Sequence, residues 1–110
     1  MKDKIIMEKI MEIRKLKRRL KDVENEITRI QNQLKTLPEG VIELKKIGKY
    51  EYYYHRVKGK SKYLGKEVPN HLKPLLRKKE LRKRLRELER EKKILEWKLE
   101  TLKHELFNLI

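Results

Sequence analysis

A heptad repeat of apolar residues runs through the first third of the chain and constrains it to a long amphipathic helix. From Ile13 to Leu37 the apolar residues follow one another at alternating spacings of three and four. This spacing places one apolar stripe along a helix, which needs a partner helix to cover it. Pro38 and Gly40 then supply the residue types that end helices. Residues 1–37 are therefore predicted to form the first helix.

The last part of the chain repeats this pattern. Leucines occupy the same two heptad positions from Leu81 to Leu109, except that Lys92 takes one of these positions. Residues 70–110 are therefore predicted to form a second helix, with Asn70 as its N-cap residue. Because only residues 38–69 separate the two helices, the simplest packing is an antiparallel hairpin.

The charge pattern supports this antiparallel arrangement. It brings the basic residues of 14–21 beside acidic residues of 87–96, and the acidic residues of 22–26 beside basic residues of 82–90. Opposite charges on both sides of an apolar seam favour one pairing of two helices over its alternatives.

The segment between the helices changes to a strand pattern. Val41–Ile47 is compatible with a strand, and Tyr50–Val57 is the strongest strand signal in the chain because it is rich in tyrosine. Gly48-Lys49 and Lys58-Gly59 are suited to tight turns, and residues 60–64 can form a returning strand. The segment is therefore predicted to be a β-hairpin or a three-stranded meander.

The predicted fold is mainly α: an antiparallel two-helix coiled-coil hairpin with a small β-hairpin or three-stranded β-meander at its tip. The chain of 110 residues is expected to be a single domain, with helix one at 1–37, the β tip at 38–69 and helix two at 70–110. Only 37% of the residues are hydrophobic and 45% are charged, which favours narrow apolar seams over a thick core. This composition argues against an enzyme, which needs a closed pocket, and no cofactor is expected.

Several site classes are also excluded by residue type. The sequence has no cysteine, no long apolar run and no continuous apolar segment of a secretory signal, so a cytoplasmic protein without contact with a membrane is expected. His55, His71 and His104 lack the spacing of metal ligands, so no metal site is predicted. The density of Lys, Glu and Arg is typical of thermophile proteins.

The predicted β tip carries the most informative pattern. The chain has a net charge of +15, and residues 40–70 hold eight basic residues against three acidic ones. Alternation along a strand places Tyr50, Tyr52 and Tyr54 on one face. Rings among cations are suited to nucleic acid, because cations meet phosphates while rings stack on bases or pack on sugars. The alternative is that the tyrosines form the core of a small sheet. The predicted nucleic-acid-binding residues are Tyr50, Tyr52, Tyr54, Arg56, Lys58, Lys60, Lys62, Lys66, Arg77 and Lys78.

The helices offer two further surfaces. The basic runs at 14–21 and 77–93 are either an ion-paired coiled-coil surface or a flank that extends the tip site. Large apolar residues also lie outside the heptad seam, at the end away from the tip in the antiparallel register. They predict a homodimer through that end, and a frayed end with exposed apolar groups is the alternative. The predicted oligomer interface is Met7, Met11, Ile94, Trp97 and Phe107.

Three resemblances accompany these patterns. The order helix, short β-hairpin, helix resembles a beta-type prefoldin subunit, whose family holds unfolded chains at coiled-coil tips, although the tip here is strongly basic. The segment YYYHRVKGKSKYLGKEVP at residues 52–69, followed by a Leu- and Arg-rich helix, is similar to an uncharacterised prokaryotic family of archaeal, plasmid and phage-type proteins. The Tyr-rich ribbon also resembles the three-stranded arm-binding modules of tyrosine recombinases, which bind DNA through the sheet.

Together these features predict a non-enzymatic nucleic-acid-binding protein that uses its basic, Tyr-rich tip and the flanking basic helix surface. The resemblance to recombinase arm-binding modules favours DNA over RNA, and the similarity to the uncharacterised prokaryotic family implies an archaeal source or a viral or other mobile-element source. The alternative is a coiled-coil protein-interaction module, either a prefoldin-like holdase or a mobile-element protein that blocks a host factor.

Overall fold

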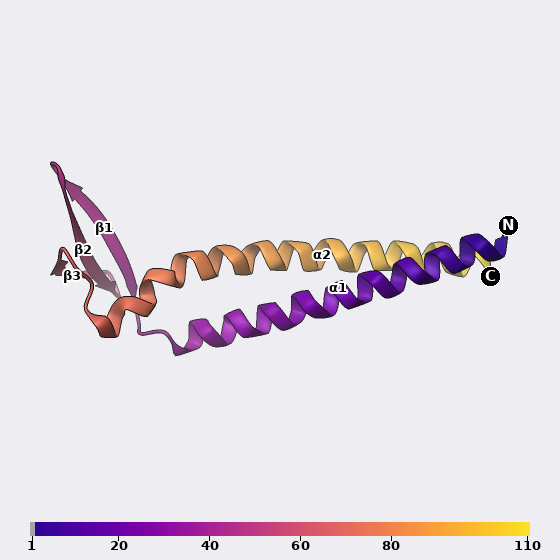
Figure 1. Cartoon of the computed structure of the whole chain (residues 1–110), viewed down its shortest axis with the longest axis horizontal. Coiled ribbons are helices and arrows are strands. Elements are labelled where there is room, and N and C mark those ends of the chain that lie inside the picture. The colour runs from indigo at the N-terminus through magenta and orange to yellow at the C-terminus, as the bar shows by residue number, and fades with distance from the viewer. Residues whose placement is uncertain (1) are drawn as a thin grey trace. The chain divides into compact units, whose positions relative to one another are not determined.

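A computed structural model describes residues 2–110 and contains two long helices and three strands (Figure 1). The elements in chain order are α1 (Lys2–Thr36), β1 (Val41–Ile47), β2 (Tyr50–Val57), β3 (Lys60–Gly65), the 3₁₀-helix η1 (Asn70–Arg77) and α2 (Lys78–Leu109). The chain divides into two compact units. The helical unit comprises the residues up to Gln31 and those from Arg84 onward, and the sheet unit comprises Asn32–Lys83.

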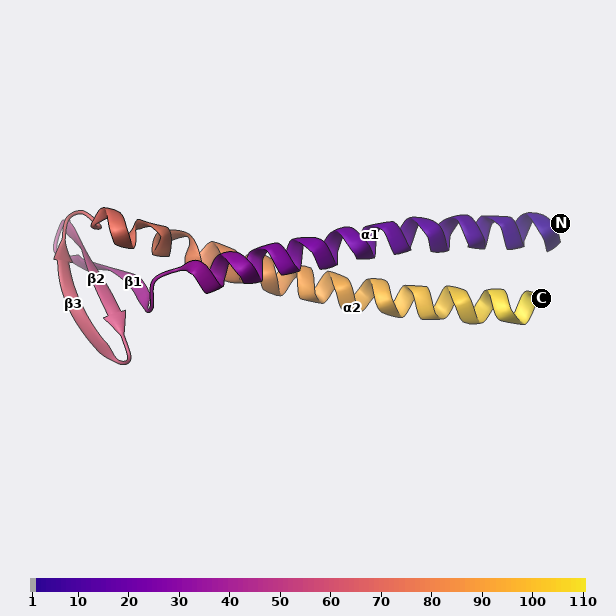
Figure 2. The ribbon, with the colours of Figure 1, turned by 90° about the horizontal axis from the view of Figure 1, so that it is seen from below.

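The helical unit is the predicted antiparallel pair, with both chain ends at the same end of the unit (Figure 2). Its seam consists of the heptad residues, of which seven are buried: Ile13, Val23, Ile27, Ile30, Leu88, Leu95 and Leu99. Val23 and Leu88 are the most completely covered of these side chains, at 0% and 1% exposure. The burial of one such side chain stabilises the folded state by roughly 1.5–3 kcal/mol relative to leaving the side chain in solvent.

Ion pairs flank this seam in the predicted register. The nitrogen–oxygen distance is 2.6 Å between Lys9 and Glu105 and 2.6 Å between Arg19 and Glu91. Arg84 donates to Glu26, and this hydrogen bond is the main cause of a lowered Glu26 pKa. These pairs are exposed, so each contributes little stability and serves mainly to fix the register, while the apolar seam holds the helices together.

The sheet is a three-stranded antiparallel meander in the order β1-β2-β3, as the strand pattern predicts. Lys58 and Gly59 both have positive φ angles, of 49° and 79°, as a type I′ hairpin turn requires. Gly48 is the first residue of the β1–β2 turn and has a φ of 63°. One irregularity interrupts the β2–β3 ladder: Tyr54 pairs with Tyr63 while Tyr53 pairs with Gly65.

The core of the sheet unit lies between one face of the sheet and η1. Val68, Leu72 and Leu75 are buried there, and four half-buried apolar side chains pack against them: Leu37, Ile42, Tyr53 and Leu64. This small cluster covers one face of the sheet with the segment that follows β3 in the sequence. A sheet of three strands needs such a covered face for stability.

The predicted start of the second helix is wrong. Residues 70–77 form a 3₁₀-helix, and the α-helix begins at Lys78. Asn70 does not act as the N-cap residue, because Pro69 occupies that position and no side chain caps the helix. Pro74 lies inside the 3₁₀ segment and explains the delay, since proline has no N–H to donate and disfavours α-helical geometry at the preceding residue.

Candidate nucleic-acid interface

The strand register separates the tyrosines between the two faces of the sheet. Tyr54 lies opposite Tyr63 on β3, and side chains directly opposite each other share a face. Tyr53 alternates to the other face, where it packs against the apolar core. The four remaining rings form what we call the tyrosine row: Tyr50, Tyr52, Tyr63 and Tyr54. One tyrosine therefore serves the core, as the alternative expects of all of them, and the other four lie on the opposite face.

Each ring of the tyrosine row lies next to the following one in the spatial order Tyr50, Tyr52, Tyr63 and Tyr54. The centroid of Tyr52 lies 6.3 Å from that of Tyr50 and 5.9 Å from that of Tyr63, and Tyr63 and Tyr54 are 5.5 Å apart. Tyr63 is 56% exposed and Tyr50 46%, whereas Tyr52 and Tyr54 are half-buried. The row is therefore a continuous aromatic surface with its two most accessible rings on β2 and β3.

Lysine amines lie over these rings. The Nζ atom of Lys45 is 4.5 Å from the centroid of Tyr54, and those of Lys66 and Lys49 are 5.0 Å and 5.5 Å from that of Tyr50. These distances fall within the range of cation–π contacts. Of the three lysines only Lys66 was predicted from the sequence.

Three members of this surface were missed: Lys45, Lys49 and Tyr63. The two-residue turn at Lys58-Gly59 is a sequence signal that predicts Tyr63 on this surface, because the turn fixes the pairing of β2 with β3. The turn at Gly48-Lys49 likewise pairs Lys45 with Tyr52. Both signals require counting residues across a turn rather than along one strand.

Arg56 and Glu43 are also on the face of the tyrosine row. Glu43 lies opposite Tyr54, and its Oε1 atom is 3.6 Å from Arg56 Nη1. This oxygen is buried and accepts no hydrogen bond among the described residues. The Arg56 side chain remains 56% exposed, so its charge is available to solvent beside a carboxylate that partly offsets it.

The other predicted lysines of the tip lie elsewhere. Lys60 and Lys62 are opposite Val57 and His55, which places them on the face away from the tyrosine row. Together with Lys58 and His55 they line a hollow of about 440 Å³. His55 Nε2 lies 2.8 Å from the carbonyl oxygen of Glu39, which ties this hollow to the α1–β1 connection. The predicted set therefore divides between two faces of the sheet.

The two predicted residues beyond the sheet have different surroundings. The amine of Lys78 donates to the carbonyl oxygen of Gly40 at 2.7 Å, and burial is the main cause of a lowered Lys78 pKa. Arg82 lowers this pKa further, and Glu39 partly opposes the shift. Arg77 lines a separate hollow beside Pro74. Lys78 therefore holds the start of β1, and its charge is less available than that of an exposed lysine.

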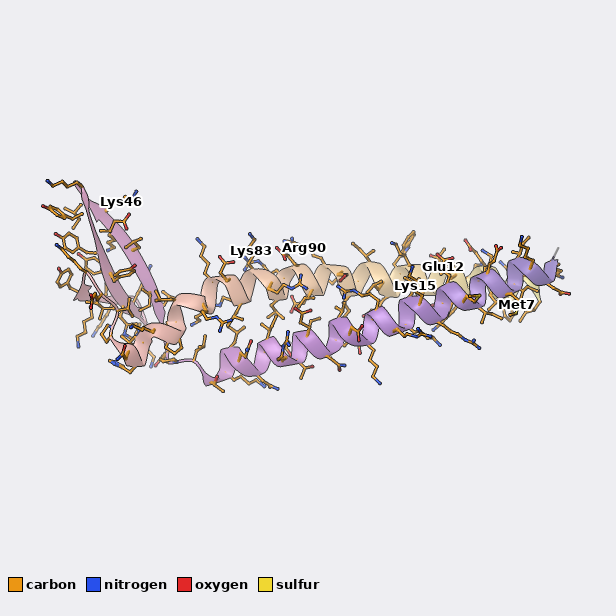
Figure 3. The ribbon with its side chains drawn as sticks, in the orientation of Figure 1. Met7, Glu12, Lys15, Lys46, Lys83 and Arg90 are labelled. Atoms are coloured by element: carbon orange, nitrogen blue, oxygen red, sulfur yellow. The ribbon has the colours of Figure 1, made fainter. Side chains whose placement is uncertain are left out.

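The predicted oligomer residues all belong to the helical unit. Trp97 is two residues from the buried Leu95 and Leu99, which is about 200° around a helix, so it points away from α1. Met11 stands two residues before the buried Ile13 and points away from α2 in the same way. The two side chains therefore lie on opposite sides of the helix pair. All five predicted interface residues are exposed: Met7, Met11, Ile94, Trp97 and Phe107. Figure 3 shows Met7 near the start of α1.

Residues 2–110 contain no group of His, Asp or Glu side chains that could hold a metal ion. Over the same residues, no helix combines the length and apolar character that a membrane span requires.

No protein-family model matches the chain, and neither the curated proteins nor the solved structures gave a match. The resemblances drawn from the sequence therefore stay predictions.

Proposed function

We propose that this chain is a non-enzymatic nucleic-acid-binding protein that binds DNA in preference to RNA through the tyrosine row and its lysines. The observation that supports the proposal most is the placement of three lysine amines over exposed or half-exposed tyrosine rings on one face of the sheet. The preference for DNA is supported by the resemblance of the Tyr-rich ribbon to recombinase arm-binding modules.

The chemistry of this face matches both parts of a nucleotide. Its ammonium groups can neutralise phosphates and release counterions, and its rings can stack on bases. Strands β1 and β2 hold two acidic residues against three basic ones. Both acids already pair within the sheet, since Lys46 is 3.6 Å from Glu51 and Arg56 is 3.6 Å from Glu43. The remaining positive charge is available to a polyanion.

Exposed rings on a sheet face also favour unpaired bases. Bases inside a duplex present only their edges, whereas each unpaired base has a free ring surface, and one stacking contact contributes about 1–3 kcal/mol. Tyr63 and Tyr50 are the accessible rings of the row. We therefore expect single-stranded DNA to bind more tightly than duplex DNA of the same length.

Fluorescence anisotropy with single-stranded DNA, duplex DNA and RNA at two salt concentrations tests this proposal. The matched pair is Lys45→Gln and Lys46→Gln: both are exposed neighbours on β1, but only Lys45 lies on the face of the tyrosine row. Figure 3 shows Lys46 on the sheet. We expect Lys45→Gln to weaken binding and to flatten the salt dependence by about 0.7 per lost phosphate contact on a single strand, and Lys46→Gln to change neither.

Two further variants separate the faces of the sheet. Tyr63→Ala should weaken single-strand binding roughly tenfold through the loss of one stacking partner. Replacing Lys58, Lys60 and Lys62 together by Gln tests the opposite face. A wild-type protein that binds no nucleic acid at low salt, or a triple variant that alone abolishes binding, would contradict the assignment to the tyrosine row.

A protein-interaction module is the second candidate function, and the exposed apolar side chains of the helical unit support it. Trp97 is 68% exposed and Phe107 is 74% exposed, and aromatic side chains of this kind are common anchors of interfaces. Replacement of both Trp97 and Phe107 by alanine should abolish binding to a partner protein while leaving nucleic-acid binding unchanged. Apolar contacts of this kind should also persist at high salt, unlike contacts to phosphate.

A further inference from the structure

The outer edge of β1 is open. The sheet order places β1 at one edge, where only β2 pairs with it. Among the described residues, no backbone hydrogen bond outside the β1–β2 ladder reaches β1. Its outward N–H and C=O groups are therefore available to another strand. Two apolar side chains of this strand are also left in solvent, since Leu44 is 49% exposed and Ile47 is 56% exposed.

The opposite edge of the sheet is protected. The register of β3 shifts between the pairings of Tyr54 and Tyr53, which breaks the regular ladder. An irregularity of this kind is one of the ways in which proteins block edge pairing. In contrast, β1 keeps one unbroken register over its seven residues and contains no proline. Only one edge of the sheet is therefore suited to accept a further strand.

We propose that β1 pairs with β1 of a second copy of this chain, antiparallel and related by a two-fold axis through Leu44. The proposed function does not require this association, which forms without nucleic acid. An antiparallel pairing centred on Leu44 uses the full length of the strand. It places Glu43 of each copy opposite Lys45 of the other and Val41 opposite Ile47.

Charge selects this register over its neighbours. In an alternative register, the side chains of β1 stay on the same face of the joined sheet only if the pairing shifts by two residues. A shift in one direction centres the axis on Glu43 and places two carboxylates together, and a shift in the other direction centres it on Lys45 and places two amines together. Like charges directly opposite each other are destabilising, whereas the register centred on Leu44 makes two opposite-charge pairs.

The pairing has a consequence for the face of the sheet. A two-fold axis perpendicular to a sheet keeps corresponding faces on the same side, so both tyrosine rows would lie on one face of a six-stranded sheet. The exposed Leu44 would pack against its own copy. An interface of two strands is small, below about 1,200 Å², so association in roughly the micromolar range is expected.

Sedimentation equilibrium of the full chain without nucleic acid tests the proposal with a charge exchange. Glu43→Lys and Lys45→Glu each place like charges opposite one another twice in the dimer, so each should weaken dimerisation about tenfold. The double variant Glu43→Lys with Lys45→Glu restores opposite charges and should recover an affinity within about threefold of the wild type. Leu44→Lys places two amines on the axis and should also give a monomer.

The near-ultraviolet circular dichroism of the tyrosines verifies that each variant retains its sheet. Three results would overturn the proposal: a wild-type monomer at about 100 µM, a double variant no better than the single variants, or a dimer that Trp97→Ala dissociates while Glu43→Lys leaves it intact. The last result would assign the dimer to the helical unit.

Discussion

Replacement of Gly40 by alanine should destabilise the sheet unit more than any other glycine substitution in the chain. Gly40 has a φ of +95°, a region that L-residues rarely adopt. A Cβ atom there would lie against the carbonyl oxygen of Arg56, 2.7 Å from Val57 Cγ2 and 2.8 Å from His55 Nε2. The residue thus needs both the backbone freedom and the small size of glycine.

Gly65 provides a matched control because its φ is +94°. A Cβ atom at Gly65 would meet only the hydroxyl oxygen of Tyr63, at 4.0 Å. Gly65→Ala should therefore cost only the backbone strain, about 1–2 kcal/mol of unfolding free energy. Gly40→Ala adds overpacking against β2, which typically costs a further 1–3 kcal/mol or so. The difference between the two variants isolates the steric contribution.

The two units can be followed separately in this experiment. All five tyrosines belong to the sheet unit, and the single tryptophan, Trp97, belongs to the helical unit. Urea unfolding is measured by tyrosine near-ultraviolet circular dichroism and by tryptophan fluorescence. We expect Gly40→Ala to move the tyrosine transition further than Gly65→Ala does. Equal shifts in the two variants would refute the steric argument, and no shift in either would refute the role of the positive φ.

Three other changes have defined outcomes. Lys58→Asn should raise the unfolding free energy of the sheet unit, obtained from the tyrosine transition, by up to about 1 kcal/mol, because asparagine tolerates the positive φ of this turn position better than lysine does. Leu99→Asp should unfold the helical unit, measured by far-ultraviolet circular dichroism, since it buries a charge at a seam position that is 5% exposed, whereas Trp97→Asp at an exposed position should not. The Arg84 hydrogen bond lowers the Glu26 pKa from its ordinary 4.5, so the stability from this pair is present above that pH and is lost as the pH falls through the folded-state pKa. Glu26→Gln should therefore reduce the fall of the melting temperature on acidification, and an unchanged fall would contradict this assignment.

The sequence by itself determined the elements and the register of the helices. Alternate spacings of three and four are sufficient to define a helix stripe, and the burial of Ile13, Val23, Leu88 and Leu95 follows it directly. The strand bounds were equally readable, because glycine turns separate tyrosine-rich and β-branched runs. Local patterns of this kind depend on residues that are close together in the chain.

Only the tertiary structure decided which face of the sheet is covered. Alternation assigns Tyr53 and Tyr54 to opposite faces, but the buried cluster around η1 decides that Tyr53 is the one that packs against the core. The delay of α2 to Lys78 has a local cause in Pro74, and tertiary contacts decide only that residues 70–77 pack beneath the sheet. The position of Lys45 over Tyr54 depends on pairing across a turn, and its accessibility depends on the other face being the buried one. These choices are made by contacts between segments distant in sequence, which local propensity does not encode.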